Sequence, residues 1–322
     1  MDNNKLPVGI SSCLLGQQVR FDGGHKKNNY IVQTLGEYFD FQPFCPEVGA
    51  GLGIPRPTIR LVQATEDAPI RAVEVKNQEA DHTAALQNYS EGIVGQLQGL
   101  CGYILKKDSP SCGMERVKIY RQDRPASPPE RNGSGVYVEI IRQHYPYLPM
   151  EEEGRLCDPI LRENFVERVF VYHRWQQLEK AGITPASLVD FHSTHKYSIM
   201  AHNQAALREL GQLVAQAGKH DDFAALCQQY FERLMIAMAE RVSRGQHANV
   251  LQHLMGYISA DIDKEDRAEL VDIIARYQQG YVPLIVPLTL LNHHFRRHPH
   301  PYISRQHYLN PHPSELMLRN QL

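Results

Sequence analysis

Short apolar runs, separated by glycines, prolines and polar turns, characterise the first half of the chain. Runs with the length and boundaries of buried strands occupy residues 8–10, 39–44 and 102–105. Stretches compatible with helices lie between them, at residues 31–38 and 83–100. Strands that alternate with helices form parallel sheets with right-handed crossovers. The pattern therefore predicts an α/β N-terminal domain with a mainly parallel sheet.

The pattern becomes helical in the second half of the chain. A polar segment rich in Pro and Gly, residues 123–135, indicates an exposed loop before this change. Helices are expected at residues 161–181, 188–217, 222–244, 249–258, 264–279 and 287–297. Pro159 and Pro287 suit first helical turns, and Gly182, Gly211 and Gly280 suit ends or interruptions. We expect two domains, 1–158 as the α/β domain and 159–322 as an all-α domain.

Composition and charge narrow the class of protein. Residues 1–7 lack a cationic stretch followed by an apolar one, and no later segment offers about 18 uncharged apolar residues in a row. We therefore expect a cytoplasmic protein with no membrane partner. The chain holds 34 Lys and Arg against 36 Asp and Glu, so its overall charge does not indicate a nucleic-acid partner.

Three of the six cysteines stand where chemistry is expected. Cys13 closes the first apolar run, Cys45 closes the second, and Cys112 follows the third after a loop, each beside Gly, Pro or Ser. Ligands of parallel sheets bind beyond the carboxyl ends of the strands, so these thiols should converge on one edge. Cys101 and Cys227 lie in apolar runs and are expected in the core.

The residues alone leave the role of these three cysteines open. They could bind zinc with an open fourth position, bind an iron–sulfur cubane with one open iron, or simply pack. No Cys-x-x-Cys pair supports one of these over the others. A glycine series at residues 49–53 lacks the spacing of a dinucleotide loop and is followed by prolines, which excludes that site.

Longer motifs around the cysteines add a family resemblance. The sequences CLLG at 13–16, CPE at 45–47 and SPSCG at 109–113 occur in this order. Together they resemble the thiouracil desulfidase family, an iron–sulfur family. In the second half, FHSTHK at 191–196, NVLQHLMGY at 249–257 and PLIVPLTL at 283–290 resemble the YbgA-type helical domain that often follows it. The resemblance covers nearly the whole chain.

This resemblance implies a cofactor and a reaction. In the family, three cysteines hold a [4Fe-4S] cluster whose fourth iron takes the substrate sulfur; here they would be Cys13, Cys45 and Cys112. The substrate would be a thiolated pyrimidine base or nucleoside of the 4-thiouracil or 4-thiouridine type, converted without net electron transfer to the oxygen compound and sulfide. Glu47 would be the general base or proton donor, and Ser109 resembles the family's catalytic serine. The alternative interpretations are that Glu47 is a carboxylate that supports the metal ligands or caps a helix, and that Ser109 is a turn hydroxyl.

Other polar residues have weaker assignments. Arg20, Asp22 and Arg56 could read the pyrimidine or a phosphate, or an Arg–Asp pair could fix the loop. Ser12 and Ser111 are expected to donate hydrogen bonds to sulfur.

The histidines are concentrated in the second half. His192 and His195 have helical spacing, but without the glutamate of a zinc protease motif they are expected to be core or surface histidines that hydrogen-bond to the backbone. The basic tail at 292–300 is expected to be a solvated basic patch. The alternative is that it holds a phosphate or a tRNA backbone, which would link the protein to tRNA modification.

Two alternative functions would use a different chemistry from that of a desulfidase. One is a nucleic-acid-binding or redox-sensing protein that carries iron–sulfur or zinc without catalysis, and the other is a zinc hydrolase. A sensor has no use for a carboxylate and a hydroxyl at an open iron, so Glu47 and Ser109 favour the enzyme.

Overall fold

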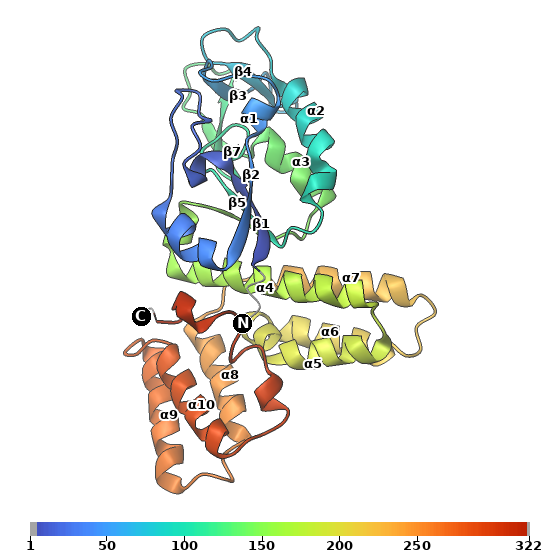
Figure 1. The fold of residues 1–322 in the computed structure, drawn as a ribbon, viewed down its shortest axis with the longest axis vertical. Coiled ribbons are helices and arrows are strands. Elements are labelled where there is room, and N and C mark those ends of the chain that lie inside the picture. Colours follow the sequence, from blue (N-terminus) through green and yellow to red (C-terminus); the bar gives the residue numbers. More distant parts are fainter. Residues whose placement is uncertain (1–4, 321–322) are drawn as a thin grey trace. The chain divides into compact units, whose positions relative to one another are not determined.

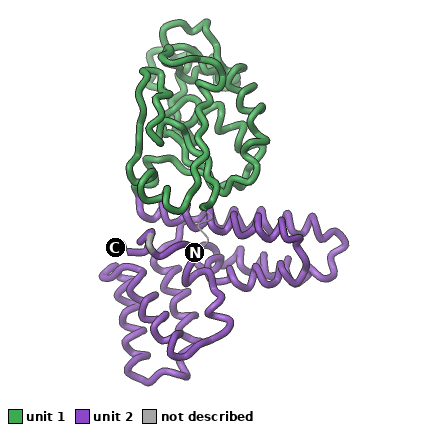
Figure 2. Tube along the Cα trace, viewed as in Figure 1, with its two compact units in different colours: residues 1–157 green, residues 158–322 purple. Residues whose placement is uncertain are grey.

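The chain divides into two compact units, Met1–Cys157 and Asp158–Leu322 (Figure 2). The computed structural model describes residues 5–320, without the side chain of Glu315. Residues 1–4, on which part of the leader expectation rests, lie outside the described residues. No helix in the described part of the chain is long and apolar enough to span a membrane.

Two four-stranded sheets form the first unit (Figure 1). The first has the order β2-β1-β5-β8 and is parallel throughout. Its strands are β1 (Leu6–Ser11), β2 (Phe39–Phe44), β5 (Gly102–Leu105) and β8 (Met150–Glu152). The predicted α/β class and parallel sheet are confirmed. Buried side chains such as Val8, Ile10 and Ile104 explain why these strands read as continuous apolar runs.

The second sheet is mixed, and the sequence did not predict it. It has the order β4-β3-β6-β7, with β3 parallel to β6 and the outer pairs antiparallel. Its strands are β3 (Ile59–Gln63), β4 (Arg71–Glu74), β6 (Val117–Arg121) and β7 (Glu130–Gly133). The expectation of a loop over 123–135 is therefore wrong at its end, because residues 130–133 pair with β6 as an edge strand.

Short helices connect the strands of the first unit. They are α1 (Pro46–Gly49), α2 (Thr83–Ile93), α3 (Val136–His144), the 3-10 turns η1 (Ser12–Leu15), η3 (Leu35–Glu37), η4 (Val94–Leu97) and η5 (Arg155–Cys157), and the π turn η2 (Tyr30–Thr34). Helices α2 and α3 lie side by side, and Leu86 and Val136 on them pack against Leu61 of β3 (Figure 1). The helix expected over 31–38 is wrong, because π and 3-10 turns replace it, and the helix expected over 83–100 ends in a 3-10 turn.

The second unit is helical, as predicted. Its elements are α4 (Pro159–Ala181), α5 (Pro185–His202), α6 (Gln204–Gln216), α7 (Phe223–Met238), α8 (Arg244–Gly256), α9 (Lys264–Gln279), α10 (Ile285–Arg297), η6 (Ile303–Arg305) and η7 (Ser314–Leu316). Pro159 occupies the first turn of α4, and the Asp158 carboxylate accepts hydrogen bonds from the next amides.

Two predicted helix boundaries in this unit are wrong. Residues 188–217 are two helices, because the Asn203 side chain caps α6 by accepting from the amide of Ala206. The interruption is therefore at Asn203, and Gly211 lies inside α6. Helix α7 stops at Met238, and Ser243 forms a capping box that starts α8 at Arg244.

The core of the second unit contains aromatic rings and buried polar groups. Trp175, the only tryptophan of the chain, stacks on Tyr230 and Phe231 at centroid distances of 5.6 Å and 5.1 Å. His247 on α8 is 8% exposed, and its Nδ1 lies 2.8 Å from the Tyr308 hydroxyl. Burial, reinforced by the charge of Arg319, lowers the pKa of His247 to about 3.

We therefore expect the second unit to lose stability in mild acid partly through His247. An unfolded histidine titrates near about 6.5, so below that pH the unfolded chain binds a proton that the folded unit refuses. Between pH 7.5 and pH 5 this difference costs about 2 kcal/mol of the free energy of unfolding. His247→Gln should remove that share of the pH dependence, measured by urea unfolding followed through Trp175 fluorescence.

His253 lies on the same helix but is exposed, which makes His253→Gln the matched control. The control should leave the pH profile of the wild type unchanged. A profile of His247→Gln that runs parallel to the wild type would show that His247 does not couple protonation to folding.

Candidate active site and cofactor site

Cys13, Cys45 and Cys112 line one cavity of about 360 Å³ in the first unit. Cys13 follows β1, Cys45 directly follows β2, and Cys112 lies in the loop after β5. Because β2, β1 and β5 are neighbours in a parallel sheet, their carboxyl ends meet at one edge. The structure thus brings together the three cysteines that the sequence singled out.

The three thiols are unpaired and hard to ionise. None forms a disulfide; Cys13 is 8% exposed and Cys112 is 6% exposed. Burial, with the nearby thiol of Cys45, raises the pKa of Cys13 to about 11, and the same two causes raise the pKa of Cys112 further. Burial also raises the pKa of Cys45. A bound metal centre would supply the positive charge that these thiolates require.

The other cysteines lie elsewhere. Cys101 is fully buried and Cys227 is 7% exposed, so both are core residues as predicted. Cys157 is exposed.

In the part of the chain that the structure describes, no group of three or more His, Cys, Asp and Glu side chains could hold a metal ion as it stands.

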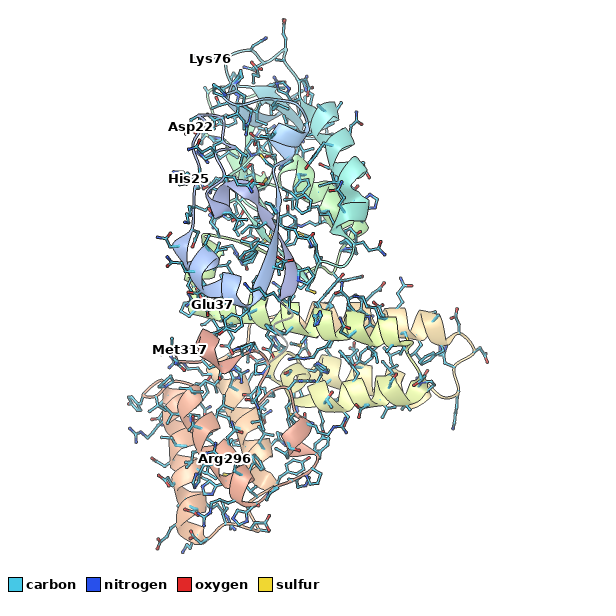
Figure 3. All side chains as sticks on the ribbon, in the orientation of Figure 1. Asp22, His25, Glu37, Lys76, Arg296 and Met317 are labelled. Atoms are coloured by element: carbon cyan, nitrogen blue, oxygen red, sulfur yellow. The ribbon has the colours of Figure 1, made fainter. Side chains whose placement is uncertain are left out.

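Two basic side chains share the cavity with the thiols. Lys106 and Arg20 line it, and the charge of each lowers the pKa of Cys13 against the effect of burial. Lys106 also pairs with Glu153 at 2.5 Å. Lys106 was not predicted as a site residue, although it directly follows β5 at the edge where the cysteines lie. Asp22 and His25, labelled in Figure 3, mark the exposed segment that carries Arg20.

Glu47 lies in the first turn of α1, two residues after Cys45. Its Oε2 accepts hydrogen bonds from Nε and Nη2 of Arg56 at 2.9 Å and 2.6 Å. Its Oε1 accepts from the Ser111 hydroxyl at 2.7 Å. Glu47 does not cap a helix, because no side chain caps α1.

Arg56 has a different role from those considered in the sequence analysis. Besides pairing with Glu47, Arg56 donates hydrogen bonds from Nη1 to the carbonyls of Val19 and Gly53, at 2.9 Å and 3.0 Å. The Arg–Asp pair that the sequence left open is formed by Arg20 and Asp22 at 3.6 Å. The guanidinium therefore joins the Glu47 turn to two neighbouring loops.

The loop with Ser109 and Cys112 folds around side-chain hydroxyls. The Ser109 oxygen accepts from the amides of Ser111 and Cys112 at 3.3 Å and 3.1 Å, and lies 3.0 Å from the Ser111 oxygen. The expected hydrogen bond from Ser111 to sulfur is present, with Oγ at 3.8 Å from Cys112 Sγ, but the same hydroxyl also lies 2.7 Å from Glu47 Oε1, an acceptor that was not predicted. A side-chain hydrogen bond with Ser11 also acts on Cys112 and lowers the pKa of its thiol, against the larger effect of burial.

Of the two histidines with helical spacing, His195 is buried and contacts a backbone carbonyl, as predicted, and His192 is half-buried. His195 is 1% exposed and its Nδ1 lies 2.8 Å from the Phe191 carbonyl, while His192 contacts the Tyr230 hydroxyl at 3.1 Å. Burial lowers the pKa of both rings. On α10, Arg296 and Arg297 are exposed whereas His294 is buried, so the predicted basic tail is only partly a surface (Figure 3).

Comparisons with known proteins agree with this division of the chain. Residues 8–153 match the family model of 2-thiouracil desulfurase, and residues 196–313 match that of a protein of unknown function, DUF1722. The first unit, with its three-thiol cavity, is therefore a 2-thiouracil desulfurase domain. The chain belongs to the family of proteins that join such a domain to a YbgA-type helical domain.

Individual relatives cover each part in turn. The uncharacterized protein YbgA of Escherichia coli (strain K12) is 31% identical over 153 residues, which are 48% of this chain and 90% of that protein. The uncharacterized protein YbbK of Bacillus subtilis (strain 168) is 27% identical over 140 residues, 42% of this chain and 88% of that protein. Among solved structures, the [4Fe-4S]-dependent thiouracil desulfidase TudS is 30% identical over 48% of this chain and 95% of its own, with a TM-score of 0.37.

The ion pair of Arg56 and Glu47 should be a large element of stability in the first unit. Their side chains are 3% and 14% exposed, and Arg56→Met removes the guanidinium hydrogen bonds to Glu47 Oε2 and to the carbonyls of Val19 and Gly53. We expect this change to cost about 3 kcal/mol, and Glu47→Leu added to it to recover part of the loss. Hydrogen exchange of peptides from residues 5–157 measures the effect, and a cost of Arg56→Met below about 0.5 kcal/mol would contradict it.

Gly135 should control the shape of the Cys112 loop. A Cβ atom there would lie 2.2 Å from the Ser111 carbonyl oxygen, so the backbone would have to move. We expect Gly135→Ala to destabilise the first unit by about 1–3 kcal/mol. Gly92→Ala in the exposed part of α2 is the control, because a Cβ there meets nothing within 4 Å and should be neutral or stabilising. Equal stability of the two variants in urea would contradict the packing argument.

Proposed function

We propose that this protein is a [4Fe-4S]-dependent desulfidase that replaces the sulfur of a thiolated pyrimidine with oxygen and releases sulfide. The substrate class is that of 4-thiouracil and 4-thiouridine. One observation carries the proposal: three free thiols at neighbouring strand ends share a cavity with a carboxylate that is held by Arg56 and Ser111. Membership of the 2-thiouracil desulfurase family and the 30% identity to TudS support it.

The donor set suits an iron–sulfur cluster. Cys13, Cys45 and Cys112 would hold it, since soft thiolates are the ligands such clusters take and these three surround one space. When bound through three thiolates, the cluster supplies a Lewis-acidic iron with an open position for the soft sulfur of the substrate. Lys106 and Arg20 offset part of the negative charge that the ionised thiols bring.

The protein's own groups handle water and protons. Replacing sulfur with oxygen uses one water and yields sulfide, with no change in oxidation state. Glu47 is the general base for that water and later returns the proton. Ser109, in the cavity wall beside Cys112, orients the water or the ring edge. A sensor or a structural cluster would not need this carboxylate and hydroxyl next to the thiols, which favours the enzyme.

The remaining parts of the proposal concern the division of labour. Residues 1–158 form the desulfidase domain and residues 159–322 the helical accessory domain. A contact of the accessory domain with tRNA stays a prediction, for which exposed Arg296 and Arg297 on α10 are the candidates. Neutralising both should then weaken binding to thiolated tRNA without changing turnover of free 4-thiouracil.

The test is anaerobic reconstitution with iron and sulfide, followed by loss of the thiocarbonyl absorbance of 4-thiouracil. The wild type should turn brown and release sulfide. Cys112→Ala should lose both iron and turnover, whereas Cys227→Ala, a buried cysteine of the second unit, should keep both. Full iron content in Cys112→Ala would refute the ligand assignment. A brown wild type that is inert on base, nucleoside and thiolated tRNA would refute the enzyme.

A further inference from the structure

We propose that Ser111 is a proton relay between Ser109 and Glu47, and that Arg56 holds Glu47 in the one orientation in which this relay works. The inference rests on the proposed desulfidase function and adds two positioning residues to it. All four side chains line the cavity of the three cysteines.

The direction of the relay follows from the hydrogen bonds that the Ser109 oxygen already accepts. The Ser109 oxygen accepts two backbone N–H groups, those of Ser111 and Cys112. Both of its lone pairs are thereby engaged, so at the 3.0 Å contact with Ser111 Oγ it must be the donor. The same two amides stabilise negative charge on the Ser109 oxygen, as an oxyanion hole does.

The hydrogen of Ser111 then has one good acceptor. It cannot point back to Ser109, which already donates to it. Of the two remaining acceptors, Glu47 Oε1 lies at 2.7 Å and Cys112 Sγ at 3.8 Å, and the nearer one is a carboxylate. The hydroxyls of Ser109 and Ser111 and the carboxylate of Glu47 therefore form one continuous chain of donors that ends at Oε1.

Arg56 determines which carboxylate oxygen receives the proton. Its Nε and Nη2 both bind Oε2, and its Nη1 is held by two backbone carbonyls. The guanidinium thus keeps Oε2 engaged and leaves Oε1 facing Ser111. Without Arg56 the carboxylate could rotate away from the relay.

The proton steps balance over the whole reaction. As the water oxygen bonds to the ring carbon, the Ser111 proton passes to Glu47 Oε1 and the Ser109 proton passes to Ser111. The lone pair that this frees on the Ser109 oxygen takes one water proton. As the C=S bond breaks and the C=O bond forms, the sulfide takes the stored proton from Glu47 by the reverse path. It takes the second water proton from the new hydroxyl. Thiocarbonyl and water become carbonyl and hydrogen sulfide.

The experiment compares Ser111→Ala and Ser111→Thr in the reconstituted full-length protein with 4-thiouracil. Loss of the relay should lower kcat about 100-fold with KM and iron content nearly unchanged, and threonine should restore most of kcat because it keeps the hydroxyl. Ser90→Ala is the control, since Ser90 is fully buried in α2, bonds only the Leu86 carbonyl and lies outside the cavity wall.

Two further readouts separate a relay from a merely structural serine. In mixtures of H₂O and D₂O, kcat of the wild type should depend on deuterium content with the curvature of several protons in flight, and Ser111→Ala should lose that curvature. Ser111→Ala combined with Glu47→Gln should be no slower than Glu47→Gln alone, because both act in one chain. Infrared difference bands assigned to the Glu47 carboxylate should shift in Ser111→Ala and stay in Ser111→Thr.

The outcomes distinguish the relay from the function on which it rests. A wild type without turnover would remove the desulfidase function and the relay with it. An active wild type with an equally active Ser111→Ala, multiplicative losses in the double variant, or an unshifted Glu47 band would overturn the relay alone.

Discussion

The parallel pairing of β2, β1 and β5 is the constraint on which the rest of the site depends. It carries Cys13 and Cys45 to one sheet edge directly, and it brings Cys112 there through the loop after β5. Hydrogen bonds from the Arg56 guanidinium and the close packing of Gly135 against the Ser111 carbonyl hold the loops beyond that edge.

The electrostatics of the cavity follow from burial. Burial of Cys13 and Cys112 and partial burial of Cys45 raise the pKa values of the three thiols, and a metal centre bound there would have to displace their protons. One oxygen of the neighbouring Glu47 carboxylate pairs with Arg56, and the other accepts a hydrogen bond from Ser111. The three thiols that would hold the metal centre and the hydrogen bond between Ser111 and Glu47 thus belong to one small cavity.

The sequence predicted those features that a single local pattern determines. The positions of Cys13, Cys45 and Cys112 at or after the ends of apolar runs predicted that the three thiols meet, and helical periodicity predicted the all-α second unit. Features that depend on partners distant in the chain were missed: the pairing of β7 with β6, and the ion pair of Arg56 with Glu47. The break at Asn203 was missed for another reason, because a side-chain cap leaves the apolar pattern of the flanking helices unchanged.

The most direct test of the central claim is the iron anomalous signal from anaerobic crystals of the reconstituted protein. The account predicts iron density inside the cavity, bonded to the sulfurs of Cys13, Cys45 and Cys112, with Glu47 and Ser109 facing the side that no cysteine covers. Iron bound elsewhere, or a cavity whose three thiols take no iron under conditions that give a brown protein, would contradict it.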